Sequence, residues 1–130
     1  MSELSTILYV EDDPDIQAVA QMALELIGGF AVTVCSSGEQ ALLAAAASAP
    51  DLILLDVMMP TMDGPTTLAE LRATPGLAGI PVIFVTAKVQ TTEVEHYKSL
   101  GAVDVIAKPF DPMTLADTVR EIWARAPLSL

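Results

Sequence analysis

Leu52-Ile53-Leu54-Leu55-Asp56 is an unbroken apolar run that ends in an acid, and it decides the fold of this chain. Four consecutive aliphatic residues leave the segment without a polar face, which is typical of a parallel strand covered by helices on both sides. Two similar runs flank it along the chain, Ile7–Val10 and Val82–Val85. These three segments predict the central strands of one parallel sheet.

Two further strands are predicted at the edges of this sheet. Ala31–Val34 and Val103–Ile106 each carry a polar residue inside the apolar run. A strand with one face toward water tolerates such a residue, whereas a strand buried on both faces does not. We therefore expect these two segments at opposite edges.

Helical patterns fill the gaps between the strands. The first predicted helix has Asp13 as its cap, Pro14 at its first position and Gly28-Gly29 at its end. The others run from about Gly38 to Ser48, from about Pro65 to Ala73, from about Thr91 to Leu100, and from just after Asp111-Pro112. Five strands alternating with five helices predict a doubly wound (βα)5 α/β fold, a three-layer sandwich with right-handed crossovers.

Length and charge narrow the classes of protein. The 130 residues suit one domain, so we expect residues 1–130 to form a single domain with no output domain attached. The net charge of −11 argues against direct contact with nucleic acid or an anionic membrane, and fits a basic protein partner, a bound cation or solubility. No apolar run reaches the roughly 18 residues of a membrane span, and residues 1–6 lack a basic leader. We expect a cytoplasmic protein.

A single cysteine, Cys35, excludes an internal disulfide. Its position at the end of a predicted strand indicates a small buried residue rather than a reactive thiol.

Polar residues gather where the predicted strands end. These are Glu11-Asp12-Asp13, Asp56, Thr86 and Lys108. Alone, each has an ordinary explanation, as a helix cap, a strand threonine or a solvated lysine. Ligands of open parallel sheets bind beyond the carboxyl ends of the strands, so four such ends together favour a functional site. If the first and third strands are neighbours, Glu11, Asp12 and Asp56 meet at close range.

Three carboxylates at close range repel one another and need a cation. Oxygen ligands with room for water suit Mg²⁺, with Mn²⁺ able to substitute. Lys108 adds a positive charge at the same edge. The set is therefore suited to phosphoryl transfer onto Asp56, with the metal and the lysine neutralising the phosphoryl oxygens.

The chain resembles the receiver domains of two-component response regulators, the CheY-like family. The resemblance rests on five stretches, in order and with the usual spacing: Ile7–Asp13, Asp51–Pro60, Met62–Gly64, Pro81–Ala87 and Lys108–Phe110. It implies a stand-alone receiver with a flavodoxin-like sheet in the order 2-1-3-4-5, which agrees with the two edges expected above. It also implies a histidine kinase or a histidine phosphotransfer protein as the phosphoryl donor.

The resemblance assigns roles to individual residues. Asp56 is the implied phosphate acceptor. Asp12 is the implied direct ligand of magnesium, Glu11 acts through water, and the backbone carbonyl of Met58 completes the protein ligands. Asp13 falls outside the acidic pair and is better explained as the helix cap.

Further roles concern the switch and the phosphate lifetime. The resemblance implies that Thr86 hydrogen-bonds the phosphoryl group and moves, that Lys108 contacts a phosphoryl oxygen, and that a cis bond precedes Pro109. Met58 and Lys88 are the side chains best placed to hold the hydrolytic water, and neither can accept its proton, so we expect slow self-hydrolysis.

One position departs from the family. A tyrosine or phenylalanine usually stands three residues before the lysine and turns inward when the threonine moves, but this chain has Val105. We therefore expect the signal to pass through the loop after Thr86 and the fourth helix. The downstream partner is expected on the face of helix 4, strand 5 and helix 5, where we place His96, Tyr97 and Lys98.

Three other classes of protein use similar sheets. A haloacid-dehalogenase-type phosphohydrolase needs a second aspartate two residues after the nucleophile, where this chain has Met58. A flavin-binding module would not place Glu11-Asp12-Asp13 beside a phosphate. A pseudo-receiver would lack a site residue, and none is missing. We therefore expect a signalling protein that is not an enzyme beyond its own phosphorylation chemistry. The sequence leaves open the kinase, the target, an output or relay role, and homodimer formation.

Overall fold

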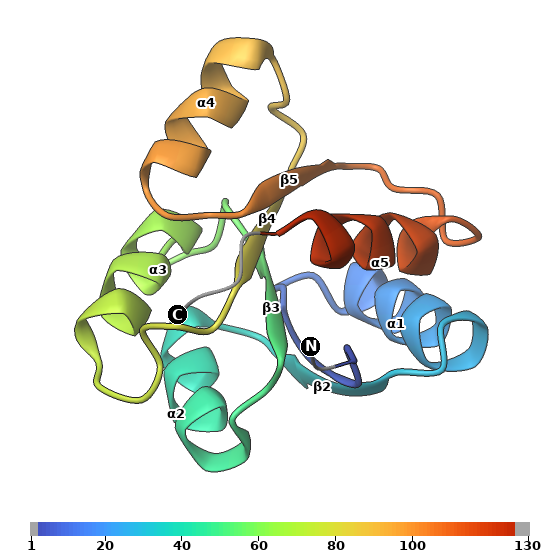
Figure 1. Cartoon of the computed structure of the whole chain (residues 1–130), viewed down its shortest axis with the longest axis horizontal. Helices are drawn as coiled ribbons and strands as arrows, with labels where there is room; N and C mark the ends of the chain where they lie inside the picture. The colour runs from blue at the N-terminus through green and yellow to red at the C-terminus, as the bar shows by residue number, and fades with distance from the viewer. Residues whose placement is uncertain (1–2, 127–130) are drawn as a thin grey trace.

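The computed structural model describes residues 3–126. Within this range, five strands form one parallel sheet in the order β2-β1-β3-β4-β5 (Figure 1). Their bounds are Thr6–Val10 (β1), Ala31–Cys35 (β2), Leu52–Asp56 (β3), Val82–Thr86 (β4) and Asp104–Ala107 (β5). The predicted strand order is confirmed, and so is the expectation that the two polar-interrupted strands lie at the edges.

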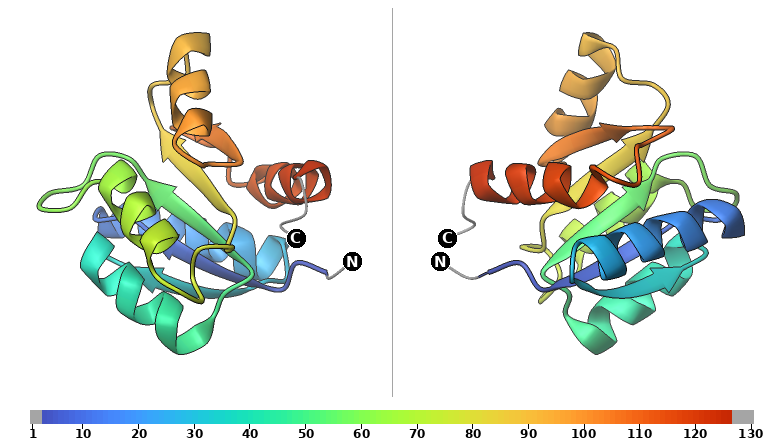
Figure 2. Two further views of the ribbon diagram at one scale, coloured as in Figure 1. Left: turned by 60° about the vertical axis from the view of Figure 1, so that its left-hand side comes forward. Right: turned by 90° about the vertical axis from the view of Figure 1, so that its right-hand side faces the viewer.

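Helices cover both faces of the sheet and complete the predicted sandwich (Figure 2). Helices α1 and α5 pack on one face, while α2, α3 and α4 pack on the other. Their bounds are Pro14–Met22 (α1), Gly38–Ser48 (α2), Gly64–Ala73 (α3), Thr91–Ser99 (α4) and Leu115–Arg125 (α5). The flavodoxin-like architecture is thus observed.

The first and last helices differ from the prediction, one in its last turn and the other in its start. The first helix continues to its predicted end, but its last turn, η1 (Ala23–Ile27), is a π-helix whose end is closed by a bond from the Gly28 N–H to the Ala23 carbonyl. A pattern of apolar positions does not distinguish this wider turn from an α-helical one. The last helix begins later than expected, because Asp111 closes a turn by accepting a hydrogen bond from the Met113 N–H at 2.9 Å.

Alternation along the strands divides the core into two layers. In β1, Leu8 and Val10 face the layer under α2 and α3, while Ile7 and Tyr9 face the layer under α1 and α5. All residues of β3 and β4 are buried. Each buried aliphatic side chain contributes about 1.5–3 kcal/mol, so the central strands form a stable support. Cys35 is buried at the end of β2, as predicted.

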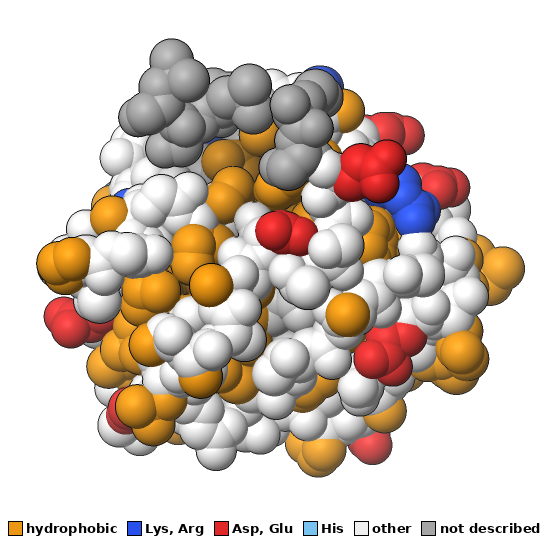
Figure 3. Space-filling model, turned by 60° about the horizontal axis from the view of Figure 1, so that its bottom comes forward, with side chains coloured by type: hydrophobic (Ala, Val, Ile, Leu, Met, Phe, Trp, Pro, Cys, Tyr) orange, Lys and Arg blue, Asp and Glu red, His pale blue; other side chains and the backbone are white. Residues whose placement is uncertain are grey.

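The surface is acidic, with scattered apolar side chains. Figure 3 shows apolar groups spread over one face on which basic side chains are sparse. Exposed apolar side chains such as Leu43 are common on soluble domains. None of the helices between residues 3 and 126 is long and apolar enough to cross a membrane.

The register of the sheet brings the strand ends to one level. Val10 pairs with Leu55, Asp56 pairs with Val85, and Thr86 pairs with Ala107. The residues that follow β1 and β5, and those that end β3 and β4, therefore share one edge of the sheet. This edge is where the candidate site lies.

Candidate functional site

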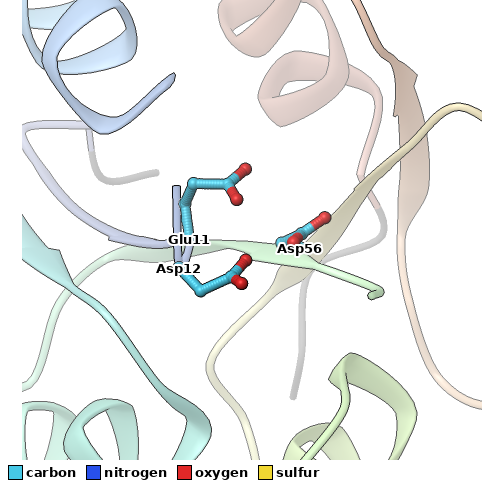
Figure 4. Close-up of side chains that lie close together, drawn as sticks. All are labelled: Glu11, Asp12 and Asp56. Atoms are coloured by element: carbon cyan, nitrogen blue, oxygen red, sulfur yellow. The ribbon is translucent and has the colours of Figure 1, made fainter. Parts of the chain in front are cut away.

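The acidic residues predicted to meet do so. Glu11 and Asp12 follow β1, Asp56 ends the neighbouring strand β3, and one carboxylate oxygen from each lies within 4.8 Å of the other two (Figure 4). Glu11 and Asp56 are buried, whereas Asp12 is exposed. Two of the three carboxylates are therefore buried, and the third reaches solvent.

Local structure holds these residues in place. Asp13 caps α1, accepting hydrogen bonds from the N–H groups of Asp15 and Ile16 at 2.9 and 3.4 Å, which confirms its predicted role. Its own N–H donates to the Glu11 carboxylate at 3.2 Å. Gln17 donates its side-chain N–H to the Glu11 carbonyl. The turn after β1 is therefore held from both sides.

Lys108 lies between the two buried carboxylates. Its Nζ is 2.9 Å from Asp56 Oδ1 and 2.6 Å from Glu11 Oε1. The Lys108–Pro109 peptide bond is cis, as the resemblance implied. One ammonium faces three carboxylates, which leaves the site with excess negative charge.

Burial and charge shift the pKa values in this group. Burial raises the pKa of the Glu11 carboxyl above its ordinary value, against the opposing effects of Lys108 and of the Asp13 N–H. Burial acts to lower the pKa of Lys108, but its contacts with Glu11 and Asp56 outweigh burial and hold that pKa above its ordinary value. Lys108 is therefore a fixed cation at neutral pH.

Thr86 completes the edge at the end of β4. Its side chain is buried, and its hydroxyl oxygen accepts a hydrogen bond from the Lys88 N–H at 3.1 Å. This bond connects the end of β4 with the loop that leads into α4. A movement of the Thr86 hydroxyl would release that loop N–H.

These groups surround one open pocket of about 330 Å³. Its lining includes all three carboxylates together with Met58, Thr86 and Lys108. Met58 is 69% exposed and stands at the rim. The Lys88 side chain is exposed and lines the adjoining hollow of the β4–α4 loop instead. Two residues predicted for the site do not line this pocket. Lys88 lies beside it, and Val105 lies in β5.

The donor set fits a hard divalent cation. Three carboxylates supply oxygen atoms at close range, and the exposed position of Asp12 leaves room for water ligands. Glu11, Asp12 and Asp56 are the side chains that would hold it. Magnesium there would neutralise charge on a phosphoryl group.

One placement on the switch side differs from expectation. Tyr97 was expected on the partner-facing surface with His96 and Lys98, but it is buried, with its ring packed edge-on against Phe84 at 5.2 Å between centroids. That part of the prediction is wrong, because Tyr97 turns toward the sheet. Val105 is half-buried against the same layer of the core.

Tyr9, a buried tyrosine two residues before Glu11, is a further polar group near the site that was not predicted. The only signal in the sequence is a hydroxyl-bearing residue inside an otherwise aliphatic strand.

Comparison with known proteins identifies the class of protein. The chain belongs to the response regulator receiver domain family, whose pattern it matches over residues 7–120. Members of this family are signalling proteins rather than metabolic enzymes, and receiver domains bind magnesium at an acidic pocket.

Individual relatives agree. The chain is 38% identical over 125 residues to the transcriptional regulatory protein CseB of Streptomyces avermitilis, covering 96% of this chain and 52% of CseB. It is 40% identical over 114 residues to the DNA-binding response regulator MtrA of Mycolicibacterium smegmatis, covering 88% of this chain and 48% of MtrA. The chain thus spans about half the length of the curated relatives it matches.

Solved structures show the same fold. The chemotaxis response regulator CheY4 of Vibrio cholerae superposes with a TM-score of 0.85 at 27% identity, covering 92% of this chain and 99% of that one. The N-terminal domain of a response regulator receiver protein from Methanoculleus marisnigri gives a TM-score of 0.74 at 38% identity, covering 95% and 99%.

The carboxylate group predicts a stabilising effect of magnesium. A ligand bound by the folded state alone, at tenfold its dissociation constant, raises the free energy of unfolding by about 1.4 kcal/mol. Asp12→Ala removes one ligand and one repelling charge, so it should lose most of this gain and be at least as stable as the wild type in EDTA. Thermal unfolding with and without magnesium measures both effects.

Glu39→Ala is the matched control, because Glu39 is an exposed acid on α2. It should keep the full response to magnesium. A wild-type melting temperature that does not respond to magnesium would rule out a shared metal site.

Proposed function

We propose that Asp56 accepts a phosphoryl group in a magnesium-dependent reaction, and that a histidine kinase or histidine phosphotransfer protein is the donor. The observation that carries this proposal is the ammonium of Lys108 between Asp56 and Glu11, with Asp12 at the open side. A buried nucleophile beside a fixed cation and a cation-binding acid pair is what phosphoryl transfer to a carboxylate requires. Membership of the receiver family supports it.

The proposed reaction follows from the positions of the side chains. A carboxylate oxygen of Asp56 attacks phosphorus, a P–O bond forms, and the bond from phosphorus to the donor's nitrogen breaks. Lys108 is close enough to neutralise a phosphoryl oxygen, since its Nζ already lies 2.9 Å from Asp56 Oδ1. Thr86 offers a hydroxyl at the same edge. In-line attack beside fixed charged groups needs no general acid from the protein.

The read-out is proposed to pass through the loop after Thr86. Because the Thr86 hydroxyl accepts the Lys88 N–H, turning it toward a phosphoryl group frees the backbone that leads into α4. Val105 is a short β-branched side chain with few rotamers, so it is poorly suited to sweep through a gap. We propose that the response reaches a protein partner through α4, β5 and α5, where His96 and Lys98 are exposed.

Several wider expectations remain predictions. These are a cytoplasmic location, a single domain over residues 1–130, homodimer formation and the choice between output and relay. Relatives named as DNA-binding or transcriptional regulators are about twice as long as the matched region. The net charge of −11 still favours a chain that does not itself contact nucleic acid.

The central prediction concerns Asp56. With acetyl phosphate or phosphoramidate and magnesium, the wild type should gain the mass of one phosphoryl group, and it should gain none in EDTA. Asp56→Asn keeps the shape of the side chain and removes the nucleophile, so its intact mass should not change. An equal gain in Asp56→Asn would refute the assignment.

The phosphorylated state is predicted to be long-lived. Met58 offers no useful hydrogen bond to a water in line with phosphorus, and Lys88 can only donate. The Met58→Asn, Lys88→Glu double variant should therefore lose its phosphate faster, by up to about 100-fold, which is the lower end of what positioned proton acceptors contribute. Intact mass measured over time after removal of the donor reports the decay.

Met113→Asn is the control for this change, since Met113 is 68% exposed, like Met58, and does not line the pocket. It should decay at the wild-type rate. If the double variant decays at that rate as well, these positions do not control the water.

The read-out hypothesis predicts where backbone signals change. Adding beryllofluoride, a phosphoryl mimic, should move amide resonances strongly from Ala87 to Leu100 and modestly around Val105. Thr86→Val removes the hydroxyl at nearly constant shape, so it should suppress the response of the loop. A silent α4 with large changes centred on Val105 would contradict the hypothesis.

A further inference from the structure

Two buried side-chain atoms lack a hydrogen-bond partner among residues 3–126, the Tyr9 hydroxyl and Glu11 Oε1. Both residues are 1% exposed. An unpaired buried polar atom costs roughly 1–3 kcal/mol, so such atoms are rare and call for an explanation. One of these atoms belongs to a donor and the other is an acceptor.

One of the two atoms belongs to β1 and the other to the residue that directly follows it. Tyr9 and Glu11 are two residues apart, so their side chains leave the strand on one face. Tyr9 packs in the layer under α1 and α5. Burial raises the pKa of the Tyr9 hydroxyl, and the charges of Glu11 and then Asp56 add to this effect. The hydroxyl therefore lies within the field of both carboxylates.

Glu11 Oε1 has an ionic partner in the structure as it stands. Lys108 Nζ lies 2.6 Å away in an ion pair, and the same ammonium donates to Asp56. Lys108 is also the group that would neutralise a phosphoryl oxygen on Asp56. When Lys108 binds a phosphoryl oxygen, its positive charge is shared with that oxygen. The buried Glu11 Oε1 then has less positive charge beside it.

We propose that Tyr9 is a positioning residue. Its hydroxyl donates a hydrogen bond, directly or through one water, to Glu11 Oε1 when Lys108 binds a phosphoryl group on Asp56. The bond replaces the contact that Lys108 gives up and keeps the Glu11 carboxylate turned toward the metal side of the site. Tyr9 touches neither the phosphoryl group nor the metal. The inference rests on the proposed phosphorylation of Asp56 and adds a residue to it.

Tyr9→Phe separates this role from simple packing. In EDTA the variant should unfold at the wild-type temperature or slightly above, because it loses only an unpaired hydroxyl. Its affinity for beryllofluoride in saturating magnesium should fall by about 2- to 12-fold, the range that one hydrogen bond of ordinary strength gives. Titration calorimetry measures the affinity, and Tyr97→Phe, the same change on the other face of the sheet, should bind like the wild type.

A second measurement does not depend on the stability of Tyr9→Phe. The chain has two tyrosines, so in Tyr97→Phe the single ¹³Cζ tyrosine resonance belongs to Tyr9. It should shift when beryllofluoride and magnesium are added together and stay in place with magnesium alone. Equal affinity of Tyr9→Phe and the wild type, or an unchanged resonance in a protein that binds beryllofluoride, overturns the inference. A wild type that binds none refutes the proposed function first, and the inference with it.

Discussion

The ion pairs of Lys108 with Glu11 and Asp56 are the interaction on which the site depends. Two carboxylates buried side by side are tolerated because an ammonium lies 2.6 and 2.9 Å from their oxygens. Its charge offsets part of the repulsion between the two carboxylates, against the burial that raises the pKa of Glu11. One ammonium beside three carboxylates still leaves net negative charge for a divalent cation.

The sheet makes this arrangement possible. Parallel strands in the order β2-β1-β3-β4-β5 end at one edge, so groups far apart in the sequence become neighbours. The helices bury both faces, and the backbone after β1 is fixed by the Asp13 cap and by Gln17. Rigid support matters because a carboxylate displaced by about 1 Å would lose much of its effect on the proposed phosphoryl transfer.

Much of this was predictable, because strand periodicity determines which residues end a strand and parallel pairing determines which ends meet. The two rules together predict that Glu11, Asp12 and Asp56 meet, as they do. Strand and helix positions alone do not predict which way a side chain points. Tyr97 carries a polar tip, but its ring turns inward onto Phe84. Lys88 is exposed and lines the adjoining hollow, and its effect on the phosphate lifetime stays a prediction. The π-helical turn η1 keeps the apolar spacing of an α-helix.

The lysine that balances the acids arrives late in the chain, just after the four-residue edge strand β5. A nascent or proteolysed chain that ends before this strand contains every carboxylate of the site and none of its compensating charge. Such a fragment bears an uncompensated burial penalty at the centre of its sheet. Electrostatics thereby links completion of the last strand to the stability of the acidic edge.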